Sequence, residues 1–375
     1  MSMKASVLSI VAVLALCGAC LAEAPYPLLM VSAYGSHYAV GLGVGQTLRT
    51  RIASYVNNND FLNRVLLPFY NTPKGREYYE KFLSANKQTY PNVYSELSGT
   101  ADGAGIPVHK LILLSLQNEM GHLAAGPGKR LLFDEGCSDV HVSTSAELLL
   151  GHNEDIDEAM RNNSYVLDAR FDDGEHVTAY TYPGNIPGNA WGFNRYGLVF
   201  STNGLYPKKV FVGGLGRYWI GRDLLAAKDM KDAIRRATVK GSAFGMSINI
   251  GSIREKTMVN IEISPDGSDV QTTKDVYYHF NMYRRLKIEQ YADTSTLHRQ
   301  ARADEMQKPT TADGVRAILG DQKDSEYLIY RSMRPTDGCL TAATVVYDLR
   351  RLTATVYTNN PKDMTPVLEL RLPDV

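Results

Sequence analysis

Residues 130–155 read RLLFDEGCSDVHVSTSAELLLGHNED, and at this stretch the pattern of the chain changes from helical to extended. The runs DVHVS and LLLGHNED are short, rich in apolar residues, and joined by the polar residues TSAE. Such a pattern predicts two strands connected as a hairpin. Cys137 stands directly behind Gly136 and just ahead of the first run, so the predicted hairpin carries a thiol at its beginning.

The part before this stretch, residues 25–136, has mostly helical periodicity. Stretches such as 60–70, 75–90 and 108–123 carry apolar residues three and four positions apart, the spacing of one helix face. The glycines at 41, 43 and 45 are spaced as in some phosphate-binding loops. No P-loop lysine follows them and no βαβ pattern surrounds them, so we interpret them as glycines that allow close packing.

The part after it, residues 137–375, alternates between strands and helices. Extended runs are predicted at 164–171, 176–184, 197–207, 245–253 and 257–267, with a closing hairpin at 340–361. Helical patterns lie at 220–239 and within 280–322. This order predicts an α+β fold with antiparallel sheets and helices packed outside them. No linker or repeat interrupts the chain, so we expect one catalytic domain.

The composition excludes some classes of partner. Lys+Arg and Asp+Glu each number 40 among the 375 residues, so the formal net charge is zero. A chain without a basic surplus is not expected to bind nucleic acid or anionic lipid.

Residues 1–24 have the pattern of a secretory signal peptide. Lys4 precedes an apolar run that ends in small residues, and cleavage is expected after Ala22 or Ala24. The alternative is a retained membrane anchor, since the run is about long enough to span a bilayer. We favour removal, which predicts a chain of the secretory pathway, secreted or lysosomal, without a membrane span. Asn162 opens a glycosylation sequon that an exported chain could use.

After removal of the signal peptide, Cys137 and Cys339 remain. Two cysteines in an exported protein are by default paired in a disulfide, which is one interpretation here. The other is that Cys137 is a nucleophile. If the Gly136–Cys137 bond were cut, the new α-amine, with a pKa near neutral, could act as base for its own thiol. Gly136 suits this role because it has no side chain to obstruct attack on its carbonyl.

Four segments in order resemble one known family. The hairpin sequence EGCSDVHV with LLLGHNEDID, then WGFNRYGLVFSTNGLYP, GMSINIGS, and YLIYRSMRPTDGCLTAATVVYDLRRLTATVYTNNP are similar to segments of the acyl-CoA:isopenicillin-N acyltransferase family (peptidase C45) of N-terminal-nucleophile (Ntn) hydrolases. The resemblance covers residues 130–362 most closely. It implies a four-layer αββα sandwich with a helical N-terminal segment, and self-cleavage between Gly136 and Cys137 into two segments of one precursor.

The resemblance also implies roles for individual residues. Cys137 is the expected nucleophile, and Asp155 and Arg331 are expected to hold its amine and thiol in register. Asn203, through its backbone or its side chain, and Asn249 are the expected donors to the oxyanion, with Ser247 as the competing assignment for the second. The chain departs from the family pattern after the nucleophile, where Ser138 and Asp139 replace the usual threonines; the Asp139 carboxylate near the scissile bond bears on how fast self-cleavage proceeds.

The implied activity is hydrolysis of a small amide such as a β-alanyl amine, or acyl transfer to a second amine, without a cofactor or metal. A metal site made by His141, His152, Glu154 and Asp155 is an alternative, but their spacing matches no standard site. Two further alternatives stay open: a non-catalytic exported relative that binds a small molecule, and a structural domain held by a Cys137–Cys339 disulfide. The substrate, the oligomeric state and the final compartment do not follow from the sequence.

Overall fold

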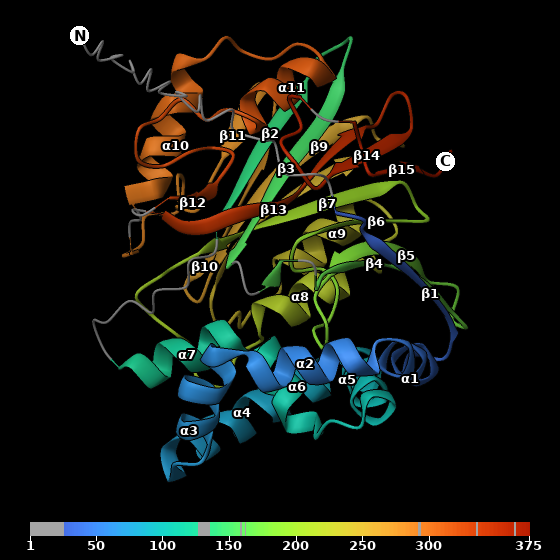
Figure 1. Ribbon diagram of the computed structural model, residues 1–375, viewed down its shortest axis with the longest axis vertical. Coiled ribbons are helices and arrows are strands. Elements are labelled where there is room, and N and C mark those ends of the chain that lie inside the picture. The colour runs from blue at the N-terminus through green and yellow to red at the C-terminus, as the bar shows by residue number, and fades with distance from the viewer. Residues whose placement is uncertain are drawn as a thin grey trace, which may run out of the picture.

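Two β-sheets form the centre of the molecule (Figure 1). The computed structural model describes residues 26–126, 136–157, 160–161, 163–291, 294–334, 337–363 and 365–375. The first sheet has eight strands, in the order β1 (Leu29–Gly35), β4 (Tyr165–Phe171), β5 (His176–Thr181), β6 (Trp191–Asn194), β7 (Leu198–Leu205), β8 (Gly245–Ser252), β9 (Thr257–Ser264) and β10 (Gly267–Thr272). The second has seven, ordered β11 (Asp275–His279), β2 (Gly136–Ser143), β3 (Leu148–Asp157), β13 (Asp337–Asp348), β14 (Thr353–Tyr357) and β15 (Leu368–Arg371), with β12 (Ser332–Arg334) paired to β13.

Helices cover the outer face of each sheet. One group belongs to the first sheet: α1 (His37–Thr47), α2 (Arg49–Asn58), the π-helix η1 (Leu62–Leu66), α3 (Leu67–Tyr70), α4 (Pro73–Thr89), α5 (Pro91–Ala104), α6 (Val108–Ser115), α7 (Gln117–Ala125), α8 (Arg217–Leu224) and α9 (Met230–Ala237). The other group, α10 (Thr294–Glu305) and α11 (Ala312–Leu319), covers the second sheet. Figure 1 shows α1 to α7 along one side of the sheets and α10 and α11 on the opposite side.

Three hydrophobic clusters separate these four layers. The first lies between the N-terminal helices and the first sheet, the second between the two sheets, and the third between the second sheet and α10 and α11. The predicted α+β fold, a four-layer αββα sandwich with a helical N-terminal segment, is confirmed.

The hairpin predicted from the opening stretch is formed by β2 and β3, which pair antiparallel along their whole length. Side chains alternate along β2. Val140 and Val142 face α11 in the third cluster, so Cys137, Asp139 and His141 face the first sheet. The polar residues of this strand therefore lie buried between the two sheets. The C-terminal hairpin is likewise present as β13 and β14.

The glycines near the N-terminus allow two helices to pack closely. A Cβ atom on Gly41 of α1 would lie 2.0 Å from the Glu96 carbonyl oxygen of α5, and one on Gly45 would lie 2.3 Å from the Thr100 carbonyl oxygen. From the other side, Gly99 approaches the backbone of α1 as closely. The close-packing interpretation is confirmed for Gly41 and Gly45, whereas a Cβ atom on Gly43 would lie within 4 Å of no described atom beyond the backbone of its own helix.

Two parts differ from the sequence prediction. β1 is a strand inside the segment expected to be mostly helical, and it pairs parallel with β4, which begins at Tyr165. Residues 280–291, expected to be helical, form a loop held by a buried carboxylate: Glu262 accepts backbone hydrogen bonds from Arg284, Arg285 and Leu286. Two sequence predictions concern residues outside the described part of the chain, namely the signal peptide and the glycosylation site at Asn162.

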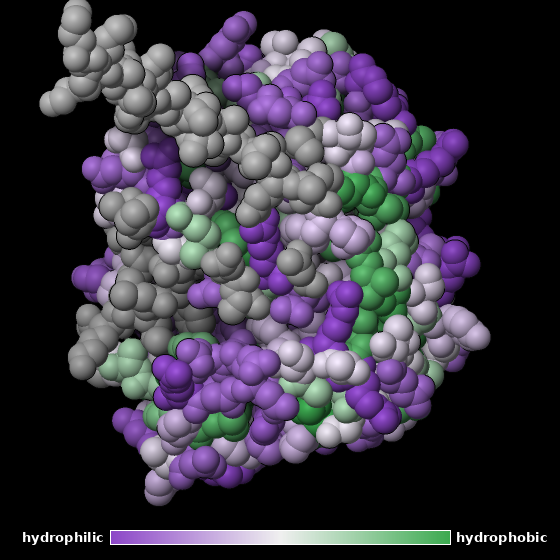
Figure 2. Space-filling view, in the orientation of Figure 1, coloured by the Kyte–Doolittle hydropathy of each residue, from purple (hydrophilic) through white to green (hydrophobic). Residues whose placement is uncertain are grey.

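The surface in the view of Figure 2 is mostly hydrophilic, with a strip of hydrophobic residues on the side where Figure 1 labels β1 and β15. Among the described helices, none combines the length and hydropathy needed to cross a bilayer.

Candidate active site

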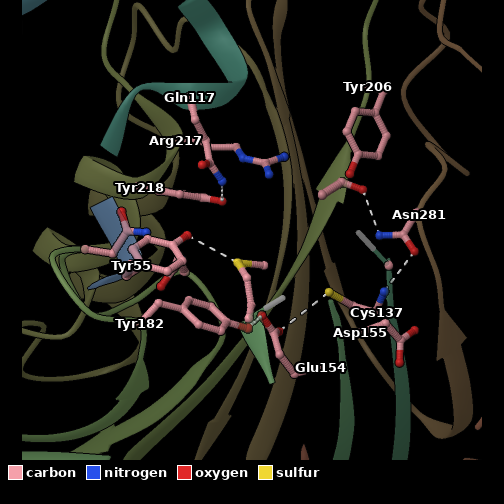
Figure 3. Close-up of a pocket in the computed structure, with 15 residues that line it drawn as sticks. Tyr55, Gln117, Cys137, Glu154, Asp155, Tyr182, Tyr206, Arg217, Tyr218 and Asn281 are labelled. Carbon is pink, nitrogen blue, oxygen red and sulfur yellow. Dashed lines mark hydrogen bonds between the residues drawn. The ribbon is translucent and has the colours of Figure 1, made fainter. Parts of the chain in front are cut away.

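Cys137 lies in a pocket between the two sheets, beside a carboxylate. It pairs with Glu154 across β2 and β3, and paired residues point to the same face of a sheet. The Cys137 sulfur lies 3.8 Å from Glu154 Oε2 (Figure 3). On the other side, the Cys137 backbone N–H donates to Asn281 Oδ1 at 3.0 Å. Cys137 and Cys339 are not joined by a disulfide, so the hypothesis of a disulfide-held domain is wrong.

The pocket is narrow and rich in tyrosines. Its lining consists of Tyr55, Gln117, Gly136, Cys137, Glu154, Asp155, Met160, Tyr182, Asn185, Asn189, Gly204, Tyr206, Arg217, Tyr218 and Asn281. Its volume of about 30 Å³ has room for about two water molecules. Gly136 and Cys137 are consecutive residues of β2, so this is the pocket of the uncleaved chain.

Asp155 and two arginines surround Gly136. Asp155 pairs with Gly136 in the hairpin register, and its Oδ2 lies 3.9 Å from Arg331 Nη1 and 4.0 Å from Arg299 Nη1. A Cβ atom on Gly136 would lie 2.3 Å from Arg331 Nη1 and 3.2 Å from Asp155 Oδ2. The site therefore has no room for a side chain at position 136. Thr341 donates to the other Asp155 oxygen at 2.7 Å.

The two facing atoms of this pair, Asp155 Oδ2 and Arg331 Nη1, are buried and make no hydrogen bond within the part of the chain that the structure describes. Burial raises the pKa of Asp155, against the opposing effect of the charges of Arg331 and Arg299. Arg331 is itself held by Asp337, whose Oδ2 accepts from Nε at 2.9 Å. The structure thus brings Cys137, Asp155 and Arg331 together around the Gly136–Cys137 bond.

A second constellation of buried polar groups runs inward from Glu154. Glu154 Oε2 is 3.1 Å from His152 Nε2, and His152 Nδ1 is 2.9 Å from Asp139 Oδ2. Tyr182 donates a short hydrogen bond to the other Glu154 oxygen. The neighbouring carboxylates outweigh desolvation and raise the pKa of His152 to about 10. The same contacts lower the pKa of Asp139 despite its burial. Asp139 is thus bound within this network.

The asparagines expected to stabilise the oxyanion lie further along the same network. Asn203 Nδ2 donates to Asp139 at 2.6 Å, and Asn249 Nδ2 donates to Asn203 Oδ1 at 3.0 Å. Asn249 Oδ1 in turn lies 3.0 Å from His141 Nε2. Neither asparagine lines the pocket, and the competing candidate Ser247 is bonded to Asn260 in the same buried layer. Each of the two asparagines uses one amide N–H group inside this layer.

Sequence reasoning missed three residues of the site. Asn281 contacts the Cys137 backbone on one side and donates to the Gly204 carbonyl oxygen at 3.1 Å on the other. Arg299, fully buried on α10, donates to the Cys137 carbonyl oxygen at 2.7 Å and to Asn281 Oδ1 at 2.9 Å. Glu154 was considered only as a metal ligand. An arginine on a helix and an asparagine in a loop carry no local signal of this role.

The residues whose potential metal-ligand atoms lie close together are not the four that the sequence predicted. His141 bonds to Asn249 and Thr273, and Asp155 belongs to the opposite face of β3, so the four predicted ligands do not converge. Ligand atoms of Cys137, His152 and Glu154 do lie within 4.8 Å of one another. A histidine that donates from both ring nitrogens to carboxylates has no lone pair for a metal, so this trio fits an ion-pair chain better.

Three comparisons show which known proteins the chain is similar to. Residues 142–363 match the model of the acyl-coenzyme A:6-aminopenicillanic acid acyl-transferase family. The beta-alanyl-dopamine/carcinine hydrolase of Drosophila melanogaster is 30% identical over 365 residues, covering 90% of this chain and 94% of that protein. The penicillin V acylase of Agrobacterium tumefaciens aligns with a TM-score of 0.37 and 11% identity, over 61% of this chain and 84% of that one.

The resemblance stated from the sequence is therefore confirmed, and the chain is an enzyme of the hydrolase and acyltransferase class that acts on amide bonds. The chain belongs to the acyl-coenzyme A:6-aminopenicillanic acid acyl-transferase family of Ntn hydrolases.

Proposed function

We propose that this enzyme cuts its own Gly136–Cys137 bond and then hydrolyses small amides of the β-alanyl amine class. The observation that carries the proposal is the arrangement around that bond, where a thiol follows a glycine that Asp155 and Arg331 enclose. The substrate class is taken from the relative, whose name gives beta-alanyl-dopamine and carcinine as what it hydrolyses.

Self-cleavage begins with attack of Cys137 Sγ on the Gly136 carbonyl carbon. The Gly136 acyl group moves from nitrogen to sulfur as a thioester, and the Cys137 nitrogen takes up the thiol proton as it becomes an amine. Water then hydrolyses the thioester, which restores the thiol and leaves Gly136 as a carboxylate. Asp155 Oδ2, buried beside this bond and without a hydrogen bond to any described residue, is the acceptor we assign to the new amine.

In the mature enzyme the Cys137 α-amine accepts the proton of its own thiol while the sulfur attacks the substrate carbonyl. Asn281 lines the pocket beside Cys137, and we assign the amide N–H that does not donate to Gly204 as the side-chain donor to the oxyanion, in place of Asn203 and Asn249, which do not line the pocket. Loss of one such donor commonly costs about 3 kcal/mol of transition-state stabilisation. The amine product leaves with the proton. Water then resolves the thioester, whereas a second amine in its place gives acyl transfer.

Intact-mass measurement of the protein tests the proposal. Wild type is expected to give two chains that break between Gly136 and Cys137, and Cys137→Ala is expected to stay uncleaved at this bond and inactive. Cleavage at the same bond in Cys137→Ala would overturn self-cleavage by this thiol. A wild type that remains one chain and hydrolyses no amide would instead support the non-catalytic binding relative.

We also propose that the chain is exported, on the pattern of residues 1–24. Expression in insect cells is expected to release a protein that begins near Ala22 or Ala24 and carries a glycan at Asn162. A protein retained in the cell with an intact N-terminus would contradict this.

A further inference from the structure

We propose that Glu154 selects the acyl group of the substrate by binding an ammonium group two methylenes away from the scissile carbonyl. This inference rests on the proposed function and adds to it the group that recognises the substrate. It makes the enzyme specific for short aminoacyl amides over neutral acyl amides of the same size.

The position of the carboxylate carries the first part of the inference. Glu154 Oε2 lies 3.8 Å from the Cys137 sulfur, and Glu154 lines the same pocket. A carbonyl carbon ready for attack lies about 3–3.5 Å from the nucleophile. In a β-alanyl group the nitrogen is three bonds from that carbon, a reach of about 3–4 Å by standard bond lengths. The ammonium of a β-alanyl group attacked by Cys137 can therefore reach the Glu154 carboxylate.

The second part is the charge around this carboxylate. His152 lies between Asp139 and Glu154, bonded to both. With His152 protonated, the three side chains together carry one net negative charge. Asp155, by contrast, faces two guanidinium groups. Of the two carboxylates bonded to His152, Glu154 is the one that lines the pocket, next to the nucleophile, where a substrate cation can reach it.

The third part is how the carboxylate is held. The Tyr182 hydroxyl donates to one oxygen (Figure 3). His152 donates to the other, so the carboxylate is held from two sides. A carboxylate offers about four lone-pair positions, of which these two bonds and the contact from the Cys137 thiol use three. Glu154 is 6% exposed. It can therefore accept from an ammonium without losing its present partners, in a site where charged hydrogen bonds are strong.

The experiment compares two substrates of the mature wild-type enzyme. β-Alanyl-dopamine carries the ammonium, and butyryl-dopamine replaces it with a methyl group of similar size. We expect kcat/KM to be about 10–100-fold higher for the β-alanyl amide, as for loss of one charged hydrogen bond. Equal values for the two amides would overturn the inference and leave the proposed function standing. An enzyme that hydrolyses neither amide would instead contradict the proposed function.

The variant Glu154→Gln keeps the shape of the side chain and removes its charge. It is expected to lower the ratio of kcat/KM for β-alanyl-dopamine to kcat/KM for butyryl-dopamine by about 10–100-fold. The matched control is Glu147→Gln, at the residue just before β3, where the carboxylate pairs with the exposed Arg351; kcat/KM for both substrates should be unaffected. An equal loss for both substrates in Glu154→Gln would overturn the role.

A measurement without any variant covers the case in which Glu154→Gln does not mature. β-Alanine is expected to inhibit the wild-type enzyme competitively, and butyrate is expected to inhibit at least about tenfold more weakly. Equal inhibition by the two acids would contradict the inference.

Discussion

At the scale of single residues, the structure explains the glycine in front of the nucleophile better than the sequence did. Sequence reasoning gave Gly136 the role of leaving the carbonyl open to attack. The structure adds that a Cβ atom there would lie 2.3 Å from an Arg331 nitrogen. The glycine therefore lets the arginine lie against the scissile bond.

A methyl group at this position should separate Arg331 from Asp155. Gly136→Ala is expected to stop self-cleavage and to lower the free energy of unfolding by about 1–3 kcal/mol, as for other overpacked sites. Intact mass and urea denaturation check the two effects. Gly43→Ala is the control, since a Cβ atom there would contact no described residue beyond the backbone of its own helix. Normal self-cleavage of Gly136→Ala would show that the reaction does not depend on the observed position of Arg331.

Two of the buried histidines, His141 and His152, should give stability a maximum near the ordinary histidine pKa. The folded pKa of His152 is raised to about 10 by Asp139 and Glu154, so its contribution is complete below pH 6.5 and is lost as pH rises toward 10. Burial lowers the pKa of His141 to about 4. The unfolded chain therefore takes up a proton at His141 as pH falls below 6.5, before the folded chain does, and stability falls there too.

Urea midpoints between pH 5 and 9, in an uncleaved Cys137→Ala background, test this prediction. His152→Gln should flatten the alkaline side of the profile, and His141→Gln should flatten the acid side. Profiles that keep their shape in both variants would contradict the assignment.

At the scale of elements, the local sequence pattern was sufficient to predict strands whose pairing partners are close in sequence. The β2–β3 and β13–β14 hairpins were predicted because each joins two neighbouring runs across a short polar connection. β1 was missed because its partner β4 begins at Tyr165, so no nearby strand signals it. The same distinction applies to the site. Cys137 and Asp155 lie in one hairpin, whereas Asn281 and Arg299 reach it from a loop and a helix far along the chain.

The α1–α5 contact offers a test within one helix. Gly41→Ala places a methyl group 2.0 Å from a backbone oxygen of α5 and should destabilise the protein by about 1–3 kcal/mol. The added methyl group of Gly43→Ala would contact no described residue beyond the backbone of its own helix. This change should stabilise the protein by about 0.5–1 kcal/mol, because alanine favours the helix. Chemical denaturation of both variants measures the difference. Equal effects would mean that α1 can move away from α5 at little cost.

At the scale of the whole molecule, the pocket of the uncleaved chain is too small for the proposed substrate. Its volume is about 30 Å³, room for about two waters. Substrate binding is therefore expected only after self-cleavage. An analogue of β-alanyl-dopamine with a methylene in place of the carbonyl should give a calorimetric signal with mature wild type and none with uncleaved Cys137→Ala. Equal affinities would show that cleavage serves only to create the amine.

The position of β1 in the first sheet affects how the cleaved enzyme refolds after denaturation. It contributes a whole strand of the first sheet from the side of the chain that precedes Cys137, and α1 to α7 share one hydrophobic cluster with that sheet. After self-cleavage, the fold would be stabilised by non-covalent contacts between two separate polypeptides. Refolding would then require two polypeptides to associate, so its yield would depend on protein concentration. A dilute sample of cleaved enzyme would regain less native protein after thermal unfolding than the uncleaved precursor does.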